Sequence, residues 1–251
     1  MSGYKNLISV LTSRHTETAS DRTGSTTNLE SKDYDVSSPD KHVIPFSTAS
    51  LADVPFQLIP EKLRRKTYVV AVTGATGATL AIRLLQALRA LDIETHLILS
   101  KWAVKTLKYE TDMTERELKD LADYSYSNSD LAATPSSGSF VHDGMFIIPC
   151  SMKTLAAVRI GLGDELISRS ADVCLKEGRK LMLVVRETPL NDIHLENMLF
   201  LRRAGAIIFP PVPAYYIRPQ TIDDLINQTV GRILDSMGLH TTGFARWAEN
   251  V

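Results

Sequence analysis

Residues 69–90 read VVAVTGATGATLAIRLLQALRA and contain a strand, a turn and a helix in succession. The first four residues are small or β-branched and apolar, which favours a buried strand. From Ala78 to Ala90 the leucines recur every three or four positions, as on one face of an amphipathic helix. Gly74 and Gly77 suit the tight turn between them. A strand that passes through a glycine turn into a helix is half of a βαβ unit, so we expect a parallel sheet.

The same alternation of apolar runs and amphipathic segments continues to the end of the chain. Further strands are predicted at residues 96–99, 145–149, 181–185 and 206–209, and helices at residues 102–109, 114–121, 151–160, 165–176, 189–204 and 222–237. Residues 125–144 are rich in Ser, Gly and Pro and are predicted to form a long loop. The fold class is therefore α/β: a three-layer, Rossmann-like (flavodoxin-like) parallel sheet with helices on both faces.

Residues 1–65 differ in composition from the remainder, being rich in Ser, Thr and Asp without periodic apolar positions. We predict a disordered N-terminal extension there and an α/β domain over residues 66–251. The first sixteen residues contain Lys5 and Arg14 but no acid, which is compatible with a mitochondrial presequence. An ordinary flexible tail explains them equally well, so the location is predicted as mitochondrial with a cytoplasmic alternative.

Charge and cysteine content narrow the classes of function. The 28 basic and 29 acidic residues give a net charge of −1, which argues against a nucleic-acid-binding surface. No apolar run approaches the ~20 residues that span a bilayer. Cys150 and Cys174 form neither a CxxC pair nor a metal-ligand spacing with His. We interpret both as buried, reduced thiols, with Cys150 as a nucleophile the weaker alternative.

Two turns between a strand and a helix could hold a phosphate. Gly74-Ala75-Thr76 would bring backbone N–H groups towards a ligand at the positive end of a helix. Ser151 could cap a second helix, with the loop from Ser151 to Thr154 offering free N–H groups. Each turn could equally serve packing or capping alone. A dinucleotide site would need an acid at the end of the second strand, where this chain has Ser100. The pattern therefore favours FMN or another phosphate ligand over NAD.

Charged residues follow the strand at 181–185. Arg186 and Glu187 stand at its carboxyl end, where open α/β sheets build their sites, and Pro189 is predicted in the first turn of the next helix. Glu187 is either a general acid/base or half of an ion pair. Arg186 is one of four cations, together with Arg169, Lys176 and Arg232. As a group they favour the hypothesis of an anionic substrate, although each cation alone could be solvated.

Six motifs carry a resemblance to a known family: TGATGA (73–78), SSGSF (136–140), PCSMKTLAA (149–157), RSADVCLKE (169–177), RETPLNDIHLENM (186–198) and PAYYIRP (213–219). Together they resemble the flavin prenyltransferase family of the UbiX/Pad1 type, from about Tyr68 to Trp247. Two positions depart from that pattern: Thr76 stands for a usual Ser, and Gly178 for a usual Arg.

The resemblance implies a metal-independent prenyltransferase. Such an enzyme joins the dimethylallyl group of dimethylallyl monophosphate to reduced FMN, and the prenylated FMN serves a UbiD-type decarboxylase as cofactor. It also implies a homo-oligomer, a dodecamer, with the flavin at a subunit interface. An FMN-dependent decarboxylase of the cysteine-decarboxylase type is a weaker alternative, because its PASANT-like loop and catalytic His have no counterpart here. A non-catalytic FMN-binding regulatory subunit is another.

The resemblance also implies roles for individual residues. Glu187 matches the catalytic acid/base. The FMN-binding positions are Gly74, Ala75, Thr76, Ser100, Ser151, Met152, Lys153, Thr154 and Arg169. The dimethylallyl phosphate ligands are Lys176, Arg186, Tyr216 and Arg232, with Trp247 as an aromatic residue that closes the site.

Overall fold

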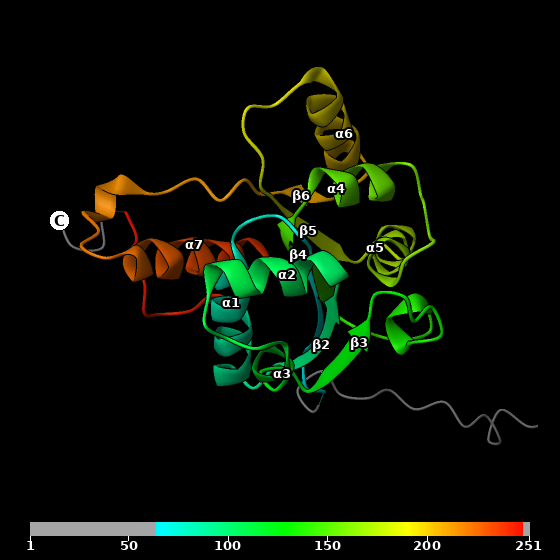
Figure 1. Ribbon diagram of the computed structural model, residues 1–251, viewed down its shortest axis with the longest axis horizontal. Coiled ribbons are helices and arrows are strands. Elements are labelled where there is room, and N and C mark those ends of the chain that lie inside the picture. The colour runs from blue at the N-terminus through cyan, green and yellow to red at the C-terminus, as the bar shows by residue number, and fades with distance from the viewer. Residues whose placement is uncertain (1–63, 248–251) are drawn as a thin grey trace, which may run out of the picture. The chain divides into compact units, whose positions relative to one another are not determined.

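Six parallel strands form one sheet in the computed structural model, which describes residues 64–247 (Figure 1). The strands are β1 (Thr67–Val72), β2 (Glu94–Leu99), β3 (Tyr124–Ser127), β4 (Gly144–Cys150), β5 (Lys180–Val185) and β6 (Ile207–Ile208). Their order, β3-β2-β1-β4-β5-β6, is that of a doubly wound Rossmann sheet. The order reverses between β1 and β4, and the carboxyl ends of these two strands are therefore where a ligand is expected.

Helices cover both faces of the sheet (Figure 1). One face carries α1 (Ala78–Ala90), α2 (Lys101–Glu110), α3 (Glu115–Lys119) and α7 (Ile222–Ser236). The other face carries α4 (Met152–Arg159), α5 (Leu166–Lys176) and α6 (Asp192–Arg203). Alternate residues of each strand feed the two cores: Val70 and Val72 pack with α1 and α7, and Val69 and Ala71 with α4 and α5. The predicted fold class is confirmed.

One strand was missed in the sequence. Residues 125–144 were predicted as loop, but Tyr124–Ser127 pairs with β2 as the edge strand β3. Its sequence, YSYS, has no aliphatic residue that would signal a strand. The strand is stabilised from outside its own sequence: the Tyr126 hydroxyl lies 2.9 Å from His96 Nδ1, and the Tyr124 ring stacks on the His96 ring at 4.6 Å.

The start of α6 also differs from the prediction. The helix begins at Asp192, and the Asn191 side chain caps it by accepting a hydrogen bond of 2.9 Å from the His194 N–H. Pro189 therefore lies before the helix and not in its first turn. The 3₁₀ turns η3 (Thr134–Ser136) and η4 (Tyr215–Ile217) complete the described elements.

The predicted N-terminal extension lies outside the described residues, apart from its last two. Arg64 pairs with Asp143, and Arg65 with Asp123 at 3.0 Å, so both contact the α/β domain. No helix within residues 64–247 is long and apolar enough to cross a membrane.

Truncating a side chain in the core between α1 and the sheet should destabilise the domain strongly. Leu84 is completely buried on α1, and we expect Leu84→Ala to lower the free energy of unfolding by about 2–5 kcal/mol. Leu91→Ala is the matched control, since Leu91 is 42% exposed, and should cost less than about 1 kcal/mol. Urea denaturation of both variants checks this; equal losses would contradict the assigned core.

Candidate functional site

Two clefts open at the carboxyl ends of the strands, on either side of the turn between β1 and α1. The first cleft, of about 290 Å³, is lined by Gly74, Ser100, Trp102, Ser151, Lys153 and Thr154 among others. The second cleft, of about 210 Å³, is lined by Thr76, Arg186, Pro211, Pro213, Leu225 and Thr229 among others. Gly74 thus faces the first cleft and Thr76 the second, with Ala75 between them in the chain.

The first cleft is built from the N-termini of two helices. Ser100 caps α2 by accepting from the Ala103 N–H at 3.0 Å, and Ser151 caps α4 by accepting from the Thr154 N–H at 3.4 Å. A helix N-terminus carries partial positive charge and unpaired N–H groups, which favour an anion. Lys153 adds a full charge at the rim, where it pairs with Glu165 at 3.1 Å. The first cleft is therefore suited to a phosphate group.

Gly74 has a steric reason to be glycine. A Cβ added there would lie 2.4 Å from the Trp102 Cβ, closer than any side chain tolerates. Its carbonyl oxygen accepts a hydrogen bond of 3.1 Å from the Thr106 hydroxyl. The β1–α1 turn is thereby held directly against α2, and its backbone forms one wall of the first cleft.

The N-terminus of α1 is already occupied by a carboxylate. Glu110, the last residue of α2, accepts hydrogen bonds from the N–H groups of Gly77 and Ala78 at 2.9 and 2.7 Å. A phosphate on these N–H groups, as the glycine turn suggested, would have to displace that carboxylate. The N-termini of α2 and α4 face the first cleft, which the first turn of α5 also lines, so the phosphate is better placed there.

The second cleft combines one cation with apolar walls. Arg186 follows β5, while Pro211 and Pro213 on one side and Leu225 on the other supply apolar surface. Such a lining suits a small ligand with an anionic head and an apolar tail. Glu187 is exposed, and its Oε1 accepts a hydrogen bond of 3.1 Å from the Thr188 N–H. Among the described residues no ion pair joins Glu187 to Arg186, which leaves both side chains available to a ligand.

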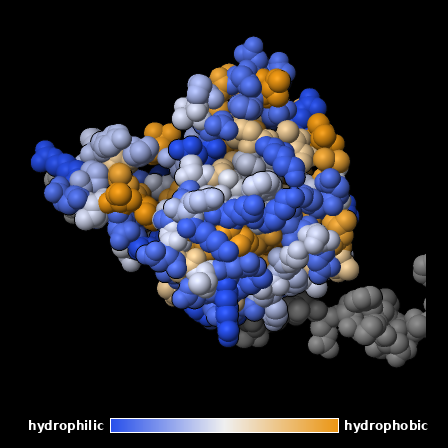
Figure 2. Space-filling view, in the orientation of Figure 1, coloured by the Kyte–Doolittle hydropathy of each residue, from blue (hydrophilic) through white to orange (hydrophobic). Residues whose placement is uncertain are grey.

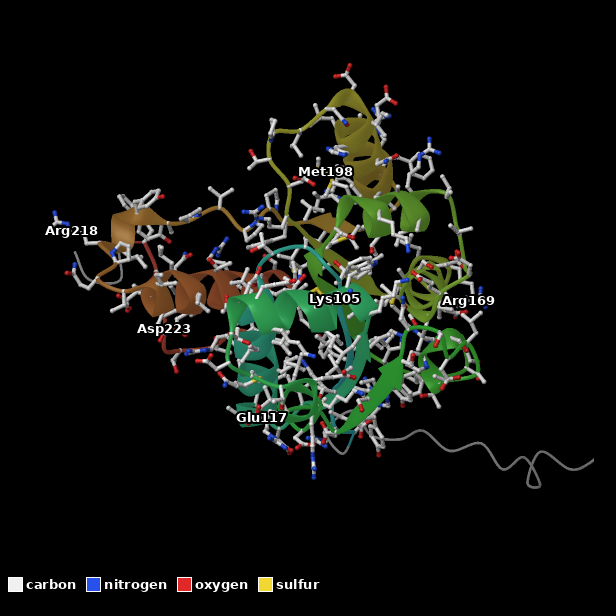
Figure 3. All side chains as sticks on the ribbon, in the orientation of Figure 1. Lys105, Glu117, Arg169, Met198, Arg218 and Asp223 are labelled. Carbon is white, nitrogen blue, oxygen red and sulfur yellow. The ribbon has the colours of Figure 1, made fainter. Side chains whose placement is uncertain are left out.

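Other predicted site residues lie outside these clefts. Met152 packs against the core beneath α4 and α5. Arg169 donates to the Ser136 carbonyl at 3.1 Å and pairs with Asp172 at 3.0 Å. In Figure 3 Arg169 lies on the opposite side of the domain from Arg218 and Asp223, which belong to the η4 and α7 region.

Lys176 lies near the amino end of β5, whereas Arg186 lies at its carboxyl end. It pairs with Glu177 at the end of α5, just before β5 begins at Lys180. Since Arg186 follows the end of that six-residue strand, the two residues are separated by roughly 20 Å along it. The described chain does not bring Lys176 to the second cleft.

The remaining candidates gather at α7. Arg232 is exposed on this helix and lies 3.5 Å from Asp235. Tyr216, in η4, packs against Trp247, with ring centroids 5.3 Å apart in an edge-on contact. Trp247 is 75% exposed, so in the described chain it does not close either cleft.

Both cysteines are structural. Cys150 and Cys174 are buried, and burial raises the pKa of each thiol to about 12. Neither thiol therefore ionises near neutral pH, and Cys150 is not a nucleophile. Residues 64–247 contain no group of three or more His, Cys, Asp or Glu side chains that could hold a metal ion.

Comparison with known proteins identifies the family. The sequence matches the Flavoprotein family over residues 57–234. It is 60% identical over 184 residues to the mitochondrial flavin prenyltransferase PAD1 of Saccharomyces cerevisiae, covering 73% of this chain and 76% of the relative. It is 51% identical to the flavin prenyltransferase UbiX of Escherichia coli K12, covering 72% of this chain and 98% of the relative. The chain belongs to the flavin prenyltransferase family.

Solved structures of this family share the fold. The crystal structure of AnUbiX (PadA1) in complex with FMN and dimethylallyl pyrophosphate superimposes with a TM-score of 0.73 at 60% identity, covering 73% of this chain and 98% of AnUbiX. A dodecameric FMN-dependent Ubix-like decarboxylase from Escherichia coli O157:H7 superimposes with a TM-score of 0.71 at 54% identity, covering 72% of this chain and 98% of that one. The family predicted from the six motifs is confirmed.

Sequence reasoning missed three residues that shape the site. The Thr73 hydroxyl donates to the Pro149 carbonyl at 2.7 Å and accepts from the Ser151 N–H at 2.9 Å, joining the ends of β1 and β4. The Asn128 side chain, directly after β3, accepts from the Ile167 N–H at 2.9 Å and so caps α5. Glu110 is the third. Only Thr73 carries a sequence signal, because it directly follows a predicted strand.

Glu110 should contribute measurably to stability. We expect Glu110→Ala to lower the free energy of unfolding by about 1–2 kcal/mol, because it leaves two helix N–H groups without their acceptor. Glu115→Ala is the control: it removes a half-exposed pair with Lys119 and should cost no more than about 0.5 kcal/mol. Chemical denaturation measures both, and a neutral Glu110→Ala would argue against the capping contact.

Proposed function

We propose that this protein is a flavin prenyltransferase that joins the dimethylallyl group of dimethylallyl monophosphate to reduced FMN. The prenylated FMN would serve a UbiD-type decarboxylase as cofactor. The observation that carries the proposal is the 60% identity to AnUbiX, whose structure contains both FMN and dimethylallyl pyrophosphate, over 98% of that protein. The two adjacent clefts agree with it, because one ligand can enter each and the two can meet at the β1–α1 turn.

The first cleft fits the phosphate of FMN. We assign the phosphate to the N-termini of α2 and α4, with the hydroxyls of Ser100, Ser151 and Thr154 as further hydrogen-bonding groups. Gly74, Ala75 and Thr76 would then lie against the flavin, where glycine permits close approach. When bound and reduced, FMN supplies the nucleophilic ring atoms, and the protein has to hold it and exclude water.

The second cleft fits the prenyl phosphate. Arg186 is placed to bind the phosphate and to stabilise the negative charge that grows on it as the carbon–oxygen bond breaks. The apolar wall of Pro211, Pro213 and Leu225 suits the five-carbon chain and keeps water from the developing allylic cation. We assign to Glu187, next in the chain, the acceptance of the proton released when the new ring closes.

Lys176 lies away from the second cleft within one chain. We propose that a neighbouring subunit supplies it in a homo-oligomer, since a relative of 54% identity is dodecameric. Arg169 belongs to the FMN side, where Ile167 and Ser168 just before it line the first cleft. A second observation supports assembly. Figure 2 shows apolar residues gathered over α6, and Ile193, Leu195, Leu199 and Phe200 are each about half exposed or more.

A mitochondrial location is proposed from the yeast relative, which is named as a mitochondrial protein. The segment that would carry the targeting signal, residues 1–63, lies outside the described residues. Expression of the full chain with a C-terminal fluorescent tag in yeast tests the proposal; a uniform cytoplasmic signal would contradict it.

The function is tested by mass spectrometry under anaerobic conditions. Purified protein is mixed with reduced FMN and dimethylallyl monophosphate, and the flavin is extracted and weighed. A flavin heavier by one C₅H₈ unit establishes the transferase. FMN that is bound but unchanged would instead favour a regulatory flavoprotein. Absence of any bound flavin would argue against the assignment of the first cleft.

Replacing Arg186 should separate the two ligands. We expect Arg186→Ala to raise the KM for dimethylallyl monophosphate by about 10- to 100-fold, since it removes a charged hydrogen bond to phosphate. The Kd for FMN should change little. Arg116→Ala, at a 92% exposed side chain on α3, is the control and should change neither value. An equal loss of both affinities would mean that Arg186 is structural.

Replacing Glu187 should affect the chemical step. We expect Glu187→Gln to retain FMN binding and to lower kcat by about 100-fold or more, because the amide cannot take up a proton. Glu115→Gln makes the same chemical change at a half-exposed side chain of α3, away from both clefts and from α6, and should leave kcat unaltered. Single-turnover flavin absorbance measures both. A Glu187→Gln variant as fast as the wild type would remove this residue from the mechanism.

A further inference from the structure

One stripe of α7 holds the C-terminal segment. Gln228, Gly231 and Asp235 follow at i, i+3 and i+7 and therefore share one face of the helix; we name them the α7 stripe. The Gln228 amide donates to the Tyr216 hydroxyl at 3.1 Å. The Phe244 ring covers Gly231 so closely that a Cβ there would lie 2.2 Å from it. The third residue, Asp235, binds Arg246.

Asp235 is the strongest of these contacts. Its side chain is only 8% exposed and accepts hydrogen bonds from both terminal nitrogens of Arg246, one at 3.0 Å. A bidentate arginine–carboxylate pair with a nearly buried acid is stronger than an exposed pair. The hydrogen bond from Arg246, aided by His240 at 3.2 Å, holds the pKa of Asp235 below its ordinary value and keeps it ionised. Arg246 also donates to the Thr241 carbonyl at 2.8 Å, which fixes the segment on itself.

The Asp235–Arg246 pair, which we call the anchor, lies next to two aromatic residues that contact each other. Trp247 is adjacent to Arg246 in the chain, and its ring meets the Tyr216 ring edge-on at 5.3 Å. Because Trp247 is 75% exposed, core packing contributes little to its position. The segment is held by its neighbours: Arg246 binds Asp235 and lies 4.2 Å from the Phe244 ring centroid. The stripe also borders the second cleft: Leu225 and Thr229 line that cleft, and Gln228 lies within one helical turn of both.

Two details indicate that the arrangement serves an anion. The Tyr216 oxygen already accepts a hydrogen bond from Gln228, so its own O–H is left to donate to a ligand. Arg232 lies 3.5 Å from Asp235, farther than Arg246 does, and can turn to an anion without releasing the anchor.

We propose that Asp235 is a positioning residue: through Arg246 it holds Trp247 against Tyr216, on the stripe that borders the second cleft, and beside them it holds Arg232, ready for the phosphate of the prenyl donor. The inference rests on the proposed function, because it takes the ligand of that cleft to be dimethylallyl phosphate. Asp235 itself touches neither ligand and acts only through its neighbours.

The first arm of the test reports the anchor without any ligand. Of the two tryptophans in the chain, Trp102 is replaced by Phe, so that Trp247 alone is seen in the full-length protein. We expect Asp235→Asn to lower the steady-state fluorescence anisotropy of Trp247, because a released segment moves on the nanosecond timescale. Asp223→Asn is the matched control, on the same helix at a 70% exposed side chain, and should leave the anisotropy unchanged. Unchanged anisotropy in Asp235→Asn would overturn the proposal.

The second arm reports the substrate and keeps Trp102 in place. We expect Asp235→Asn to raise the KM for dimethylallyl monophosphate by about tenfold while the Kd for FMN stays the same, and Asp235→Glu to restore part of the loss. Arg246→Gln, outside the core, should reproduce the effect if Asp235→Asn folds poorly. Lowered anisotropy with an unchanged KM would overturn the claim that the segment serves the site. If the wild-type protein yields no heavier flavin, the proposed function fails and the substrate claim with it, whereas the anisotropy arm still decides whether Asp235 anchors the segment.

Discussion

The site depends on one feature of the topology: after β1 and after β4 the chain crosses to opposite faces of the sheet. The helix after β1 covers one face and the helix after β4 covers the other, so an opening remains between them. The Thr73 hydroxyl spans this opening by donating to the Pro149 carbonyl and accepting from the Ser151 N–H. With the strand ends fixed in this way, the backbone of the β1–α1 turn and the N-terminus of α4 face the same space.

Local patterns predicted the parts of this arrangement that arise within one element. The apolar spacing of residues 78–90 predicted α1 with its observed bounds, and Ser151 caps a helix as predicted. Ser100 also caps a helix, which was not predicted. Five of the nine residues that the resemblance assigned to FMN, Gly74, Ser100, Ser151, Lys153 and Thr154, line the first cleft together. Parallel strands bring their carboxyl ends to one edge, which is why these residues, far apart in sequence, share one cleft.

Contacts between distant elements could not be predicted in the same way. Strand β3 forms because it pairs with β2 and because Tyr126 contacts His96. Asn128 caps α5 only because that strand is present. Glu110 looked like an ordinary surface acid at the end of α2, yet its carboxylate satisfies the N-terminus of α1. None of these partners is specified by spacing along the chain, since each depends on how two elements pack.

The predicted cations differ in their partners, and this difference bears on how each could bind a phosphate. Arg169 and Lys176 each pair with an acid one to three residues away, and these pairs are at least one-third exposed. Exposed pairs of this kind contribute little to stability, so exchanging the acid for a phosphate of a neighbouring subunit's ligand costs little. Arg186, by contrast, has no such partner among the described residues and already lines the second cleft. This difference is consistent with the proposed assembly, in which the loosely paired Lys176 becomes a ligand where a second copy meets the first.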